Sequence, residues 1–158
     1  MRKNKIPADI RSATIIRDHG RCRACGFADP DHLECDHVIP ESLGGAATLE
    51  NTMVLCGACN KAKGDTIVSG LPILPPVRGF GDFESVMRGR AAFRQTVRAA
   101  RQRMLRETVE AVRAWRADSV PVATIRDRIP ALVGNRNVQK VIFEAFRGDL
   151  ETMREFAK

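Results

Sequence analysis

Two cysteine pairs are the residues of this chain whose types and spacing most clearly indicate chemistry. Cys22 and Cys25 form one Cys-x-x-Cys pair, and Cys56 and Cys59 form a second. Four thiolates in this arrangement bind tetrahedral zinc, because the tight turn within each pair presents both sulfurs to one ion. A single pair could instead be a redox dithiol, but two pairs favour a structural zinc site. The N-terminal stretch MRKNKIPADIRSATIIRDHG has no apolar segment typical of a secretory signal, so a disulfide framework is not expected.

A second group of potential ligands lies between the pairs, in the stretch LECDHVIPESLGG from residue 33 to residue 45. Cys35, Asp36 and His37 are consecutive there, and each of these side-chain types can bind a metal. Four other cysteines already complete a zinc site, so we expect Cys35 to pack as a small apolar residue. Asp36 and His37 then remain for a second site of a different kind.

The segment that holds these residues has the pattern of two short strands followed by a helix. LECDHVI has strand character and is ended by Pro40. ESLGGAATLEN is rich in glycine and small polar residues, which predicts a loop. TMVLC predicts a second strand, and CNKAKGD predicts the start of a short helix that ends at Gly64.

This order of elements and residues resembles the HNH, or ββα-metal, nucleases. The resemblance rests on Asp36-His37, on Asn51, on Asn60 directly after the second cysteine pair, and on Lys63-Gly64. It covers roughly residues 15–65. The family often has histidine where this chain has Asn60, a variant that many active members share.

Phosphodiester hydrolysis gives these residue types their expected roles. The reaction requires a deprotonated water molecule and stabilisation of charge on the phosphorane and the leaving oxygen. An imidazole, with an ordinary pKa of about 6.5, is a suitable base at neutral pH, so His37 is the expected general base. Asp36 and Asn60 offer the hard oxygens that Mg2+ or Mn2+ prefers. The resemblance implies that Asn51 positions the base. Lys63 is expected to contact a phosphate, although taken alone it could be a solvated helix charge.

The second half of the chain predicts helices. Residues 67–82 are rich in glycine and proline and are expected to form a linker. From residue 83 to residue 117 the pattern is helical, with one apolar stripe that we expect to pack in a core; the stripe consists of Phe93, Val97, Ala100, Met104, Ala111 and Trp115. Residues 119–158 predict several short helices broken at Pro130, Gly134 and Gly148. Part of this region loosely resembles a helix-turn-helix, and it could read DNA or serve as a packing module or dimer surface.

The charge of the chain predicts a polyanionic partner. The sequence has 26 Lys and Arg residues against 19 Asp and Glu residues, a formal net charge of +7. Arginines are dense between residues 88 and 106, where no acidic residue occurs. We expect this helix to contact DNA phosphates through Arg90, Arg94, Arg98 and Arg101, without reading base sequence. A solvated arginine face, or a compositional bias toward arginine, is the alternative.

Together these features predict an α+β protein. Residues 1–66 are expected to form a small ββα-metal core braced by a four-cysteine zinc, and residues 83–158 an all-helical C-terminal extension. The predicted function is that of a metal-dependent DNA endonuclease, which would nick DNA as a monomer and cut both strands as a homodimer. A non-catalytic zinc-stabilised DNA-binding module, an accessory protein of phage DNA packaging, and action on RNA are alternatives. No membrane span or small-molecule cofactor is expected, and the expected location is the cytoplasm.

Overall fold

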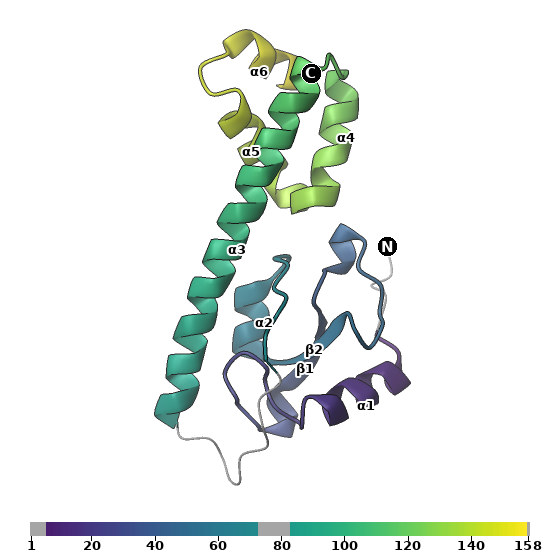
Figure 1. Ribbon diagram of the computed structural model, residues 1–158, viewed down its shortest axis with the longest axis vertical. Helices are drawn as coiled ribbons and strands as arrows, with labels where there is room; N and C mark the ends of the chain where they lie inside the picture. Colours follow the sequence, from purple (N-terminus) through teal and green to yellow (C-terminus); the bar gives the residue numbers. More distant parts are fainter. Residues whose placement is uncertain (1–5, 73–82, 158) are drawn as a thin grey trace. The chain divides into compact units, whose positions relative to one another are not determined.

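The computed structural model describes residues 6–72 and 83–157 (Figure 1). The chain forms two compact units, residues 1–100 and residues 101–158. The boundary between the units falls within the long helix α3 (Phe83–Ala117). Helix α3 begins at Phe83, and its first half packs with the first unit.

The first unit contains the strand–loop–strand–helix order that the sequence predicts, and it confirms the α+β class. Its elements before α3 are α1 (Ala8–Arg17), a 3-10 turn η1 (Pro30–His32), β1 (Leu33–His37), a second 3-10 turn η2 (Glu41–Leu43), β2 (Thr52–Cys56) and α2 (Gly57–Lys63). The two strands pair antiparallel, with Leu33 opposite Cys56 and His37 opposite Thr52. All five residues of β2 are buried, as expected for a strand covered on both faces.

The two faces of this sheet contact different helices (Figure 1). Glu34 and Asp36 lie two residues apart on β1, and both contact side chains of α2. Thr52 of β2 contacts α1 instead, since its hydroxyl lies 2.7 Å from that of Thr14. Because successive side chains of a strand point to opposite faces, the sheet lies between α1 and α2.

Arg17 and Asp18 join the end of α1 to β2. Asp18 is 1% exposed, and its carboxylate accepts hydrogen bonds from the Val54 N–H (2.8 Å) and from Arg17 Nε (2.7 Å). The same Arg17 guanidinium donates to the Thr52 carbonyl (2.7 Å). A buried carboxylate is tolerated where its lone pairs are used in this way.

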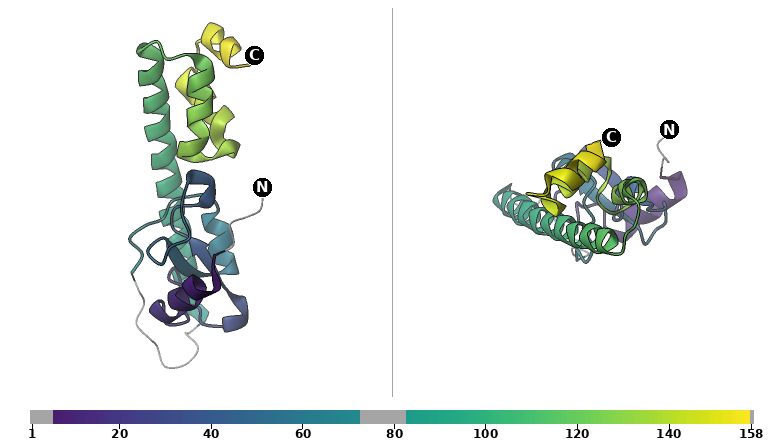
Figure 2. Two further views of the ribbon diagram at one scale, coloured as in Figure 1. Left: turned by 90° about the vertical axis from the view of Figure 1, so that its right-hand side faces the viewer. Right: turned by 90° about the horizontal axis from the view of Figure 1, so that it is seen from above.

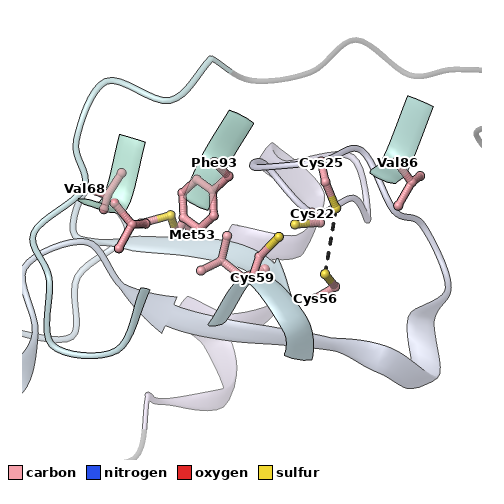
Figure 3. Close-up of a cluster of buried hydrophobic side chains, with 10 residues drawn as sticks. Cys22, Cys25, Met53, Cys56, Cys59, Val68, Val86 and Phe93 are labelled. Atoms are coloured by element: carbon pink, nitrogen blue, oxygen red, sulfur yellow. Dashed lines mark hydrogen bonds between the residues drawn. The ribbon is translucent and has the colours of Figure 1, made fainter. Parts of the chain in front are cut away.

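Apolar packing of the first unit centres on the cysteine pairs (Figure 3). Met53 and Leu55 of β2 pack there, together with Val86, Phe93 and Val97 from the first half of α3. Residues 67–72 form no helix or strand, yet Val68 lies in this core. The rest of the expected linker, residues 73–82, lies outside the described residues.

The second unit is a helical cluster around the second half of α3 (Figure 2). Its other elements are α4 (Val122–Val133), the 3-10 turn η3 (Asn135–Asn137), α5 (Val138–Ala145) and α6 (Leu150–Ala157). Ile125 and Ile129 of α4 are fully buried against Val112 of α3. The expected break at Pro130 is absent, because α4 continues through this residue to Val133. Proline lacks a backbone donor and therefore weakens the helix locally.

Replacing Asp18 with alanine should destabilise the first unit strongly. The change leaves the Val54 N–H and the Arg17 guanidinium without their buried acceptor, and breaking a buried ion pair from one side costs about 3–5 kcal/mol. Chemical denaturation followed by circular dichroism measures the loss, and Asp65→Ala, at an exposed turn position, is the control. A cost below about 1 kcal/mol would contradict the role assigned to Asp18.

Candidate functional site

Four cysteine sulfurs meet at one point of the first unit. The Sγ atoms of Cys22, Cys25, Cys56 and Cys59 all lie within 4.8 Å of one another, and all four residues are buried. The Cys25 and Cys56 sulfurs are 3.8 Å apart (Figure 3). Zinc–sulfur bonds of about 2.3 Å in a regular tetrahedron place the sulfurs about 3.8 Å apart. The residues therefore fit a zinc ion whose four positions are all taken by protein, which is the arrangement of a structural site.

Local backbone structure presents these sulfurs. In the first pair, the Cys22 N–H donates to the Phe27 carbonyl and the Gly26 N–H to the Cys22 carbonyl, each at 2.8 Å. Gly26 has a φ of 77°, a conformation that glycine adopts without strain. The second pair needs no such turn, because Cys56 ends β2 and Cys59 lies in the first turn of α2.

Hydrogen bonding among the four thiols divides them into two kinds. Hydrogen bonding with Cys22 lowers the pKa of Cys25 to about 7 and also lowers the pKa of Cys56. Hydrogen bonding with Cys25 raises the pKa of Cys22, and hydrogen bonding with Cys22 raises that of Cys59. Because zinc binds thiolates, the protons held by the metal-free thiols must leave when zinc binds, and zinc affinity falls as the pH is lowered.

Cys35 lies apart from this cluster, as the sequence predicts. Its Sγ donates to the Arg11 carbonyl at 3.7 Å, toward α1. Burial raises the pKa of the Cys35 thiol, which favours the protonated form over the thiolate that binds metal.

Asp36 is held by a buried lysine. Lys63 is fully buried, and its Nζ lies 2.8 Å from Asp36 Oδ2 and 3.3 Å from the Gly64 carbonyl. The Asp36 side chain is 25% exposed. Burial of an ammonium group costs several kcal/mol unless the charge is paired, so this ion pair is what allows Lys63 to lie inside. Lys63 is therefore not the solvated helix charge that was its alternative interpretation.

Asn60 is held by Glu34, a residue for which the sequence predicted no role. The Asn60 Nδ2 donates a hydrogen bond to Glu34 Oε2. With the amide nitrogen directed to Glu34, Oδ1 is the part of the amide that remains to accept or ligate. The alternation of side chains along a strand could have indicated this contact, because Glu34 lies two positions before Asp36 and therefore on the same face of β1.

Asn51 fixes the loop between the strands. Its Oδ1 accepts from the Ile39 N–H (2.8 Å), and its Nδ2 donates to the carbonyls of Ile39 (3.1 Å) and Ala46 (2.8 Å). Gly45 allows this closure, because a Cβ there would lie 1.8 Å from the Ile39 carbonyl oxygen. Asn51 therefore contacts the backbone two residues beyond His37. No hydrogen bond between Asn51 and the His37 ring occurs among the described residues.

His37 ends β1 and is 8% exposed. Its Nε2 is buried and has no hydrogen-bond partner in the described part of the chain. An unpaired buried polar atom costs about 1–3 kcal/mol, and such atoms in native structures call for an explanation. His37 also directly follows Asp36, and consecutive Cα atoms lie about 3.8 Å apart. The two residues therefore end β1 together, with their side chains on opposite sides of the strand.

The arginines of α3 fall into two environments. Arg94, Arg98 and Arg101 are exposed at helical spacing. Arg90 is half-buried, with its guanidinium 3.7 Å from the Cys56 sulfur. The structure thus brings Arg90 to the cysteine cluster and leaves the other three on the surface.

The comparisons with known proteins agree with the site. The family model described as HNH endonuclease matches residues 22–66. This segment contains both cysteine pairs and every expected catalytic residue, so the resemblance drawn from the sequence is confirmed for it. The searches of curated proteins and of solved structures found no match. The match supports a nuclease or DNA-binding function with DNA as substrate or partner. Among the described residues, no helix is long and apolar enough to cross a membrane.

Zinc content should distinguish the clustered cysteines from Cys35. Cys59→Ser removes one sulfur from the cluster and should lose most of the bound zinc, because serine is a poor ligand for this soft site. Cys35→Val should retain about one zinc per chain, since its sulfur is outside the cluster. Metal analysis of the purified variants measures both. Zinc loss in Cys35→Val would show that the four ligands are wrongly assigned.

Proposed function

We propose that this chain is a metal-dependent DNA endonuclease with its reactive centre at the end of β1. The observation that carries the proposal is the buried, unpaired Nε2 of His37, the residue that follows Asp36 on β1, within the segment that matches the HNH family. The missing partner of this nitrogen is, in our proposal, the water molecule that attacks the phosphodiester.

His37 acts as the general base. Its Nε2 accepts the proton of the attacking water, which requires a neutral imidazole with a free lone pair. Among the described residues no carboxylate or other hydrogen-bonding group occupies this nitrogen. The ring is held at the last position of β1, opposite Thr52, so that it is presented by a paired strand and not by a free loop.

Asp36 and Asn60 would hold the catalytic divalent cation. Their donor set, a carboxylate oxygen and an amide oxygen, suits Mg2+ or Mn2+. When bound, this cation supplies neutralisation of negative charge on the phosphate and the leaving 3′-oxygen. Glu34 orients the Asn60 amide by accepting from its nitrogen, and Lys63 holds Asp36 from the interior side.

Asn51 is the positioning residue of this centre. Its three side-chain hydrogen bonds fix the backbone at Ile39 and Ala46. This loop continues directly from His37, so its closure determines where the base stands. A base placed within about 3 Å of the water that it activates can transfer a proton, and small displacements lower the rate steeply.

The exposed arginines of α3 supply contacts to the DNA backbone. Arg94, Arg98 and Arg101 follow one side of the helix at i, i+4 and i+7. Such contacts raise affinity without reading base sequence and make it dependent on salt. One centre cuts one strand, so a monomer nicks and a homodimer makes double-strand breaks. The products carry 5′-phosphate and 3′-hydroxyl ends.

A non-catalytic DNA-binding module is the second candidate, because the zinc site and the arginines would serve binding alone. It predicts DNA binding with no dependence on His37. The unpaired imidazole nitrogen favours the nuclease, since a binding module has no use for a buried, unsatisfied base.

Replacing His37 with alanine should lower cleavage of supercoiled plasmid about 10²- to 10⁴-fold, the usual contribution of a general base. The assay contains Mg2+ or Mn2+, with a chelator-treated reaction to show that cleavage needs the cation. His32→Ala is the matched control, because the His32 side chain is 71% exposed and pairs with Asp29 away from the proposed centre.

Binding of a labelled duplex, followed by fluorescence anisotropy, separates the two candidates. The nuclease proposal expects His37→Ala to bind as wild type does while cleaving poorly. Equal cleavage by wild type and His37→Ala would remove His37 from the mechanism. Binding without cleavage by the wild type in either metal would favour the non-catalytic module.

A further inference from the structure

Arg90 of α3 has two partners at the cysteine cluster. Its Nη2 lies 3.7 Å from the Cys56 sulfur, within range of an N–H···S hydrogen bond. Its guanidinium carbon lies 5.3 Å from the centre of the Phe27 ring, in a cation–π contact. Phe27 follows the first cysteine pair and Cys56 opens the second, so one guanidinium contacts both sides of the metal site.

Gly89, the residue before Arg90, explains how α3 comes so close to the first cysteine pair. A Cβ on Gly89 would lie 2.8 Å from Cys25 Cα and 3.1 Å from Cys25 Cβ. Only glycine allows the helix backbone to touch the first cysteine pair at this distance. One turn to either side, Val86 and Phe93 complete the contact by packing with the cysteines (Figure 3).

Electrostatics gives this contact a function. Four thiolates outweigh the charge of one zinc ion, so the occupied centre is negative and lies in a buried site. A guanidinium stays protonated in proteins, so Arg90, whose Nη2 lies 3.7 Å from the Cys56 sulfur, offsets part of the negative charge of the centre. Charge-assisted hydrogen bonds are the stronger class of such contacts.

Arg90 also lies where solvent approaches the metal site. A pocket of about 250 Å³ is lined by Cys56 and Arg90, together with Phe27, Glu34 and residues of the two adjoining turns. A competing ligand that enters this pocket therefore comes close to both Cys56 and Arg90.

We propose that Arg90 is an outer-sphere residue of the zinc site, which retains the metal by donating to Cys56 and anchors the start of α3 to the metal. It is a positioning residue for zinc, not a contact to DNA phosphates. The proposal rests on the four-cysteine site and is independent of the proposed nuclease activity.

Zinc release tests this assignment. The purified full-length protein, loaded with zinc, is mixed with an excess of a chromogenic chelator, and the rate of colour formation is recorded. Arg90→Met removes the charge and the donors but keeps an apolar stem of similar length. Loss of an outer-sphere partner typically weakens a metal site about 10- to 100-fold, so release should be about tenfold faster or more. Arg88→Met is the control, because Arg88 is 66% exposed and pairs with Glu84 on the same helix; its release rate should equal that of wild type.

Two further variants keep the test decisive if Arg90→Met retains no zinc. Arg90→Lys keeps a charge and one donor and should release zinc at an intermediate rate. Gly89→Ala keeps Arg90 but displaces the helix from Cys25, and it should also release zinc faster than wild type. Wild-type release rates in Arg90→Met, or in both of these variants, would overturn the proposal. A zinc-free Arg90→Met protein beside a zinc-bound Arg90→Lys protein would support it.

Discussion

The first unit depends on one constraint, that four sulfur atoms must lie within reach of a single ion. This requirement brings the turn at Cys22–Cys25 against the junction of β2 and α2 at Cys56–Cys59. The two-stranded sheet is too small to be stable alone, and metal ligation is a usual means by which small units compensate for a limited apolar core. The ligation also fixes where α2 starts, and thereby where its inner face meets β1.

Strand alternation then divides the residues around the sheet between its two sides. Glu34 and Asp36 share the side that faces α2. Asn60 of α2 donates to Glu34, and Lys63 forms the ion pair with Asp36. Thr52 and its cross-strand neighbour His37 share the other side, toward α1. The even-numbered polar residues of β1, Glu34 and Asp36, thus contact α2, whereas the odd-numbered His37 lies on the side toward α1. A shift of register by one residue would exchange the two environments.

The sequence predicted those features that depend on chemistry close along the chain. Cysteine spacing predicts the ligand set because the two cysteines of each pair are close along the chain. The strand and helix patterns predict β1, β2 and α2 for the same reason. The positions of Lys63, Glu34 and Arg90 could not be predicted in this way. A lysine at the end of a short polar helix has the pattern of a surface residue, and only the packing of α2 on β1 buries it beside Asp36. Arg90 belongs by composition to the arginine-rich face, and only the close approach at Gly89 directs it to Cys56.

The ion pair between Lys63 and Asp36 has a thermodynamic consequence for the proposed centre. A carboxylate that is already neutralised by a buried ammonium attracts a divalent cation less than a bare carboxylate would. In the proposed centre, a bound cation would give this neighbourhood surplus positive charge, which a phosphodiester anion would offset. The two ligands would then favour each other's binding, and such a coupling is reciprocal by linkage. Such a centre would hold its cation loosely when empty of nucleic acid and firmly when a phosphate is in place.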